Sequence, residues 1–254
     1  MMAAGMVTLG AVVGSFLNVC ASRLPKGRSL WMPGSACPAC ASPIRWYDNI
    51  PVLSFLLLGG RCRDCKERIA WRYPIVEMAT ALLFALAYLR IGWGPDLIPA
   101  LLFLSALIVI TVIDLDHQLI PDRITLPGIV AGFAGSVVLG RPSWLNSLLG
   151  IVVGGGILFV IIVLSGVALG VPGMGGGDMK LGAMLGAFLG WQLMLLGLFL
   201  AAFLGGAVAL ALLAAGRKGR KDPLPFGPFL AFGGAVSLFW GEGIVQWYLS
   251  AFAG

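Results

Sequence analysis

The chain has 254 residues, of which 59% are hydrophobic and only 11% charged, with a net charge of +6 and a mean hydropathy of +0.97. A soluble domain carries about a quarter charged residues, so this composition excludes a soluble enzyme, a disordered protein and a secreted disulfide scaffold. The sequence predicts an all-α polytopic membrane protein.

Apolar segments of about 20 residues, the length needed to cross a bilayer as a helix, recur along the chain. The first covers residues 3–21, and others are expected at 75–89, 97–113, 124–139, 148–169 and 229–249. The stretch 181–215 has no charged residue and is long enough for two helices. We predict a turn at Trp191 and Gln192, preceded by a short span that begins near Gly177. The sequence therefore predicts about eight transmembrane helices.

Positive charge gathers between the apolar segments. Nine of the 17 Lys and Arg lie in residues 22–74, and four more lie in residues 217–221. If residues 22–74 face the cytoplasm, the outer loops hold only Arg90 and Arg141, as the positive-inside rule requires. We therefore expect three parts, a first transmembrane helix (1–21), a cytoplasmic domain (22–74) and a helical membrane bundle (75–254), in a bacterial inner membrane. A basic loop between apolar segments is more often a topology signal than a nucleic-acid site, which argues against a nucleic-acid partner.

The predicted cytoplasmic domain contains two Cys-x-x-Cys pairs, formed by Cys37, Cys40, Cys62 and Cys65. Two such pairs supply the four thiolates of a tetrahedral structural zinc site. Two disulfides are the alternative, but a reducing cytoplasm disfavours them. A redox centre needs only one Cys-x-x-Cys pair. Cys20 stands alone in the first helix and is expected to be a packing residue.

Two aspartates lie at the ends of apolar segments. Asp114 follows the apolar run 101–113, and Asp178 lies in the glycine-rich segment 173–180. A carboxylate at mid-membrane costs about 2.5–3.5 kcal/mol and usually marks a functional site. The predicted topology places both aspartates at the cytoplasmic boundary. Two carboxylates at one depth can share a proton and activate water.

The neighbouring polar residues have simpler explanations. Asp116 lies about 200° around a helix from Asp114, so only one of the two can face the same partner. Asp122 is interpreted first as a helix N-cap, and Glu77 as a residue that favours a helix N-terminus. His117 can reach Asp114 but is expected to be an interfacial polar residue. Lys180 either favours the ionised form of Asp178 or extends towards the interface.

Taken together, these residues resemble the type IV prepilin peptidases. The resemblance runs nearly end to end, and it includes an aspartate motif around Asp114 and a Gly-x-Gly-Asp motif ending at Asp178. The matching motifs are residues 14–19 with 23–25, 35–40, 49–51, 60–65, 73–77, 114–122, 175–181 and 225–229.

The resemblance implies an intramembrane aspartyl protease that uses Asp114 and Asp178 to cleave pilin or pseudopilin precursors at the cytoplasmic membrane face. Such precursors, of type IV pili or type II secretion, have a short basic leader and a hydrophobic helix that lies in the lipid bilayer. The resemblance also implies N-methylation of the new N-terminus with S-adenosylmethionine, and Gly60 and Arg61 match positions linked to that activity. The sequence has no dinucleotide-type glycine motif, so the methyltransferase prediction depends on the resemblance alone.

Two other functions compete with this interpretation. A proton-coupled transporter would use the two aspartates as a relay near a broken helix. It would not explain the four cysteines, and no inverted repeat is visible. A membrane scaffold would use a zinc module to dock a partner, with the aspartates as packing or capping residues.

Overall fold

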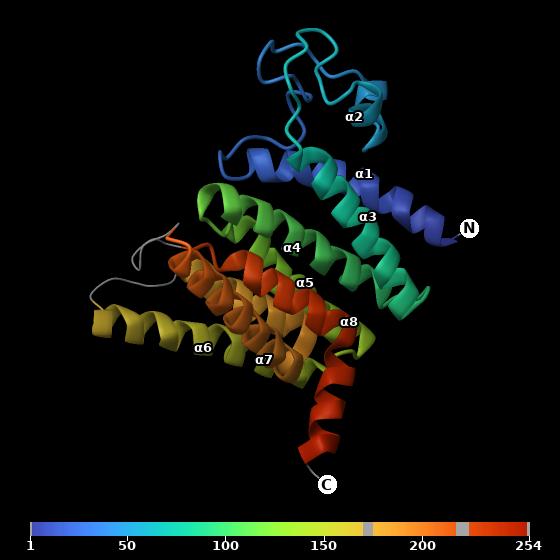
Figure 1. Cartoon of the computed structure of the whole chain (residues 1–254). Coiled ribbons are helices and arrows are strands. Elements are labelled where there is room, and N and C mark those ends of the chain that lie inside the picture. The colour runs from blue at the N-terminus through green and yellow to red at the C-terminus, as the bar shows by residue number, and fades with distance from the viewer. Residues whose placement is uncertain (1, 170–174, 217–223, 253–254) are drawn as a thin grey trace. The chain divides into compact units, whose positions relative to one another are not determined.

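The computed structural model describes residues 2–169, 175–216 and 224–252, and within these ranges the chain is helical with no regular strand. The chain forms two compact units, Met1–Leu97 and Ile98–Gly254 (Figure 1). Two parts of the predicted pattern lie outside the described residues: Gly173 and Met174 of the glycine-rich segment, and the four cations of residues 217–221.

The first unit is built on two packed membrane helices, α1 (Met2–Arg23) and α3 (Arg72–Ile91) (Figure 1). A Cβ atom at Gly10 would lie 2.6 Å from the Cα of Ala81, and one at Gly14 would lie 2.8 Å from the Cα of Glu77. The two glycines therefore let the helix backbones approach closely. The segment between the helices carries the short helices η1 (Trp46–Asn49) and α2 (Leu53–Leu57).

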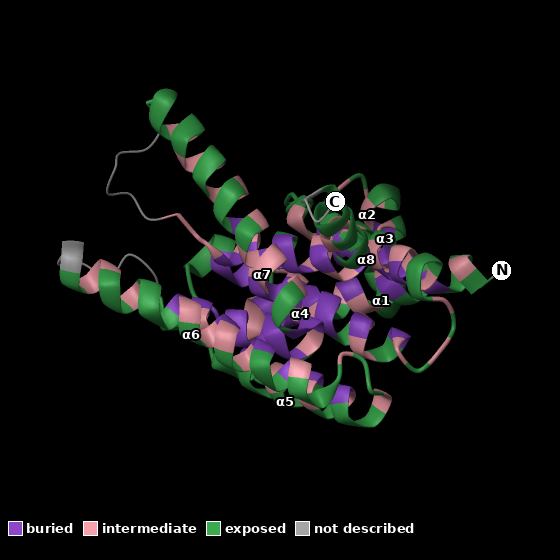
Figure 2. Ribbon diagram, turned by 90° about the horizontal axis from the view of Figure 1, so that it is seen from below, coloured by how far each residue is buried: buried purple, intermediate pink, exposed green. Residues whose placement is uncertain are grey.

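The second unit contains α4 (Leu97–His117), α5 (Asp122–Leu139), α6 (Trp144–Leu169), α7 (Gly176–Ala214) and α8 (Gly227–Phe252). Its buried core is supplied mainly by α4, the first part of α7 and α8. Buried residues are concentrated on α4 and α7 in Figure 2. The largest fully buried side chains of this core include Phe103, Ile110, Leu181, Met184 and Leu230.

Helix α7 reverses direction at Gly190, whose φ of 77° and ψ of 171° are not helical. Its first part (176–189) runs parallel to α8. At one end, Asp178 lies near Asp114, which accepts the N–H of Gly227 at the start of α8. Further along both helices, Leu185 lies against Gly234. Its second part (191–214) runs antiparallel, because Leu193 meets Gly241 whereas Gly205 meets Phe229. Asn146 Oδ1 accepts the Trp191 N–H at 3.1 Å beside this turn.

Among the described residues, seven helices are long and apolar enough to cross a membrane. Since α7 supplies two segments, the expectation of about eight transmembrane helices agrees with the structure. The predicted turn at Trp191 and Gln192 lies next to the observed break at Gly190. The predicted short span begins at Gly176 rather than Gly177.

Candidate active site and metal centre

The two predicted aspartates meet at one end of the second unit. Asp114 lies in the last turn of α4 and Asp178 in the first turn of α7, with exposed fractions of only 4% and 8%. The two carboxylates are close enough to interact electrostatically. Asp116 and His117, by contrast, are exposed at the end of α4. Asp114 and Asp178 are therefore buried together, whereas the polar side chains next to Asp114 in its motif are exposed to solvent.

A backbone N–H holds one oxygen of each carboxylate. Gly227 donates its N–H to Asp114 Oδ2 at 2.9 Å, and Gly175 donates its N–H to Asp178 Oδ2 at 3.1 Å. The second contact is the carboxylate half of a capping box, because Gly175 is the N-cap of α7 and Asp178 is three residues later.

Glycines fit the backbone tightly around this pair. A Cβ atom at Gly227 would lie 2.7 Å from Asp114 Oδ2. A Cβ atom at Gly177 would lie 2.8 Å from the Cβ of Ile120, in the connection between α4 and α5. Sequence reasoning did not assign Gly227 to the site, although the Pro-Phe-Gly-Pro-Phe motif at residues 225–229 marked its position.

One prediction about a charged neighbour is wrong. The N-cap of α5 is Pro121, and the Asp122 carboxylate instead accepts from Lys180 Nζ, at 2.7 Å for both oxygens. Lys180 therefore pairs with Asp122, whose side chain is exposed, as a lysine that extends towards the interface can. Asp122 is 54% exposed, so the pair contributes at most about 1 kcal/mol and serves mainly to join α5 to α7.

The four cysteines form two copies of one turn. In each copy the first cysteine donates its N–H to the carbonyl of the residue five positions later. The residue four positions after the first cysteine donates its N–H back to that cysteine's carbonyl. The residue after the second cysteine has a positive φ in both copies, 59° at Ala41 and 61° at Lys66. The residues flanking each turn form an isolated bridge, Ala36 with Pro43 and Arg61 with Arg68.

The cysteine thiols are free, and all four Sγ atoms lie within 4.8 Å of one another. The Sγ atoms of Cys37 and Cys65 are 3.8 Å apart, which matches the separation of about 3.8 Å for two sulfurs bound tetrahedrally to one zinc ion at 2.3 Å. Hydrogen bonds from the Ser42 side chain and backbone lower the pKa of Cys40 to about 6. Because metals bind thiolates, the cluster can hold a metal ion.

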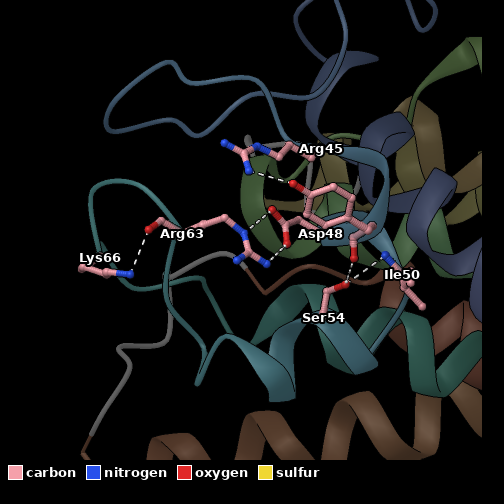
Figure 3. Close-up of polar contacts among 7 residues, drawn as sticks. Arg45, Asp48, Ile50, Ser54, Arg63 and Lys66 are labelled. Carbon is pink, nitrogen blue, oxygen red and sulfur yellow. Dashed lines mark hydrogen bonds and ion pairs between the residues drawn. The ribbon is translucent and has the colours of Figure 1, made fainter.

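A polar network connects the second cysteine turn to η1 (Figure 3). Arg63 donates from Nε and Nη2 to the two oxygens of Asp48 at 2.8 and 2.6 Å, a bidentate pair. This guanidinium lowers the pKa of Asp48. Lys66 Nζ donates to the Arg63 carbonyl, and Arg45 donates to the Tyr47 hydroxyl. Arg63 therefore ties the second cysteine turn to η1.

Gly60 and Arg61 lie at the start of the second cysteine turn. Gly60 has a φ of +67°, and a Cβ atom there would lie 3.0 Å from the ring of Phe55. Arg61 is exposed. Gly60 therefore adopts a backbone conformation that favours glycine, and its missing side chain leaves room for the Phe55 ring.

The segment between α1 and α3, residues 24–71, contains both cysteine turns and is called the cysteine module below. A cavity of about 690 Å³ lies in the first unit, between this module and the adjoining ends of α1 and α3. Its volume is within the range of small-molecule sites. Phe55, Cys37 and Cys62 line it, whereas Gly60 and Arg61 do not. Asn18 and Glu77 also line it, with exposed fractions of 3% and 8%. Glu77 lies beyond the first turn of α3, so its interpretation as a helix N-terminal residue is wrong.

Comparisons with known proteins identify the family. Residues 8–91 match the bacterial peptidase A24 N-terminal domain, and residues 101–210 match the type IV leader peptidase family. Proteins named prepilin leader peptidase/N-methyltransferase are similar over most of their length. The one from Aeromonas hydrophila is 38% identical over 95% of this chain and 91% of its own length.

Two further relatives with that name come from distant bacteria. The Pseudomonas aeruginosa protein is 38% identical over 98% of this chain and 93% of its own. The Bacillus subtilis protein is 35% identical over 94% of this chain and 95% of its own. No solved structure gives a significant match. These similarities favour the peptidase over the transporter, and the chain belongs to the type IV leader peptidase family.

Proposed function

We propose that this chain is a prepilin leader peptidase and N-methyltransferase of the bacterial inner membrane. The observation that carries the proposal is the pairing of two buried aspartates, Asp114 and Asp178, in a chain of this family. The substrates are pilin or pseudopilin precursors with a short basic leader and a hydrophobic helix. In this proposal residues 1–21 are the first transmembrane helix, residues 22–74 are a cytoplasmic domain, and residues 75–254 are a helical membrane bundle that carries the aspartate pair.

The aspartate pair performs the cleavage. One carboxylate is ionised and takes a proton from water as the water oxygen attacks the scissile carbonyl. The other is protonated and donates a hydrogen bond to the carbonyl oxygen. The pair titrates as a unit, so neither role belongs to one residue. The N–H groups of Gly227 and Gly175 orient the carboxylates during these steps.

The methyl donor is S-adenosylmethionine, and the first unit is where we propose it binds. The cavity there is large enough for a small molecule, and the Arg68 and Arg72 side chains that line it suit a carboxylate such as that of the donor's amino-acid part. Gly60 and Arg61 do not line the cavity, but Gly60 leaves room for the ring of Phe55, which does.

The direct test of this function uses the purified full-length protein in detergent with a pilin precursor and S-adenosylmethionine. Mass spectrometry is expected to detect loss of the leader and then addition of one methyl group to the new N-terminus. If every pilin and pseudopilin precursor encoded in the same genome stayed intact, this result would contradict the proposal.

We expect one zinc ion per chain, held by Cys37, Cys40, Cys62 and Cys65. The close sulfur cluster supports this ligand set, because a tetrahedral four-thiolate site is typical of structural zinc. Elemental analysis of the purified protein measures the metal. Cys20→Ser is the control and should leave the zinc content unchanged, since Cys20 is buried in α1. A zinc-free protein containing two disulfides would contradict this prediction.

We also expect Gly227→Ala to lower the cleavage rate about 100-fold, because displacing a catalytic group by about 1 Å is enough for such a loss. The new methyl group would lie 2.7 Å from Asp114 Oδ2 and would push the carboxylate aside. Gly243→Ala, on the same helix, is the matched control, since a Cβ atom there meets nothing within 4 Å. Equal cleavage rates for the two variants would show that Gly227 does not position Asp114.

A further inference from the structure

Two buried residues that line the cavity in the first unit, Asn18 and Glu77, offer hydrogen-bond acceptors. Glu77 Oε2 accepts the N–H of Val52 at 2.7 Å, and the Ser15 hydroxyl also bonds this carboxylate. Asn18 Nδ2 donates to the Tyr73 carbonyl at 3.1 Å, which turns the amide so that its oxygen is the group left to bind something else.

The amide oxygen of Asn18 is buried and has no hydrogen-bond partner in the described part of the protein. A buried acceptor without a donor costs about 1–3 kcal/mol, so such an atom in a cavity wall points to a ligand that donates. Glu77 is a second acceptor that lines the same cavity, and its carboxylate matches a cation when it is ionised. A carboxylate and an amide oxygen together suit an ammonium group.

The depth of these residues limits which ammonium group can reach them. Asn18 lies five residues before the end of α1 at Arg23, and Glu77 lies five residues after the start of α3 at Arg72. Both are therefore about 8 Å along membrane helices from the ends that lead into the cysteine module. An ammonium group carried at the end of a hydrophobic helix suits a site between two membrane helices.

We propose that this cavity is the acceptor site for methyl transfer and that Asn18 and Glu77 bind the newly exposed α-amino group of the cleaved substrate helix. This inference rests on the proposed function. It assigns the acceptor half of the reaction to α1 and α3, whereas the aspartate pair of α4 and α7 performs the cleavage. A precursor whose leader is still attached has no α-amino group at this position and does not satisfy the site.

Glu77 is a catalytic residue in this assignment. The substrate's α-ammonium gives one proton to the Glu77 carboxylate, while the Asn18 amide oxygen accepts a hydrogen bond from the same nitrogen. The freed lone pair forms an N–C bond with the methyl carbon of S-adenosylmethionine. The C–S bond breaks and its electron pair stays on sulfur, which yields S-adenosylhomocysteine and a methylated ammonium.

The test compares two peptides that correspond to the mature N-terminal helix of a pilin, one with a free α-amino group and one acetylated there. Their binding to the full-length protein in detergent is measured by fluorescence anisotropy, which does not depend on turnover. Glu77→Gln keeps an acceptor for Val52 but loses the charge. It should weaken binding of the free-amine peptide about tenfold and leave the acetylated peptide unchanged.

The same variant separates the enzyme's activities. Glu77→Gln should lower methylation about 100-fold, the usual contribution of a general base, while leader cleavage and S-adenosylmethionine binding stay unchanged. Asn18→Ala should also weaken binding of the free-amine peptide. Thr8→Ala is the matched control, because Thr8 lies on α1 outside the cavity lining and donates to the Ala4 carbonyl.

An equal loss of affinity for both peptides would overturn the proposal, since it would mean that Glu77 supports packing rather than the amine. Unchanged methylation in Glu77→Gln would overturn it as well. If the wild-type protein processes no precursor, the proposed function fails, but the two peptides still decide whether this cavity recognises an amine.

Discussion

Asp114→Asn and Asp178→Asn are each expected to abolish leader cleavage, with a loss of about 1,000-fold or more, because acid–base catalysis by a positioned group contributes about 10²–10⁴-fold. The mechanism needs one ionised and one protonated carboxylate, and an asparagine amide can supply neither. Asparagine keeps the shape of the side chain and an oxygen for the N–H of Gly227 or Gly175. Folding should therefore survive. The rate is measured by mass spectrometry of the pilin product, and folding by thermal unfolding in detergent.

Asp116→Asn is the matched control for this result. Asp116 lies two residues from Asp114 in the same helix, but its side chain is exposed. It should retain near-normal cleavage, and Glu77→Gln should also cleave normally. If Asp116→Asn lost cleavage while Asp114→Asn retained it, the assignment within the Asp-Leu-Asp motif would be wrong.

The second large effect is expected from replacing Cys37 and Cys62 together with serine, which should lower methylation more steeply than cleavage. The module between α1 and α3 is too small for a large hydrophobic core, so metal binding must help to hold it together. Cys37 and Cys62 also line the cavity in the first unit. The aspartate pair lies on α4 and α7, which belong to the second unit. Both products are measured on one pilin substrate at matched protein levels.

The outcome of this double variant distinguishes three arrangements. A steeper fall in methylation agrees with a methyl-transfer site beside the cysteine module. Equal losses would mean that the module also shapes the protease site. Unchanged methylation would move the methyl-transfer site elsewhere, to the membrane face of the helix bundle.

The helices could be predicted because membrane insertion imposes a length and a composition on each span. The first predicted span, 3–21, lies within α1, and the glycine at position 190 breaks α7 beside the predicted turn. The four cysteines were predictable for a similar reason, since each Cys-x-x-Cys pair builds its turn from local hydrogen bonds. Local patterns of this kind do not require knowledge of which helices are neighbours.

The errors concern side chains whose partners are distant in sequence. Asp122 pairs with Lys180, 58 residues away, instead of capping its own helix. Glu77 bonds the backbone of Val52, 25 residues earlier, and is buried where a helix N-terminal role would leave it exposed. Gly227 reaches Asp114 across 113 residues. Local propensity contains no information about such contacts, so only the packed structure reveals them.

The reversal of α7 at Gly190 has a consequence for how the backbone is kept away from lipid. The first part of the helix, residues 176–189, is only about 20 Å long at 1.5 Å per residue, whereas the hydrocarbon core is about 30 Å thick. Residues 181–187 are all buried, so protein rather than lipid surrounds this short segment. Non-helical backbone at membrane depth is tolerated where it is buried in protein, and Gly190 is itself buried. The half-length helix can therefore hold Asp178 at one end and turn the chain back at the other without exposing unpaired backbone groups to hydrocarbon.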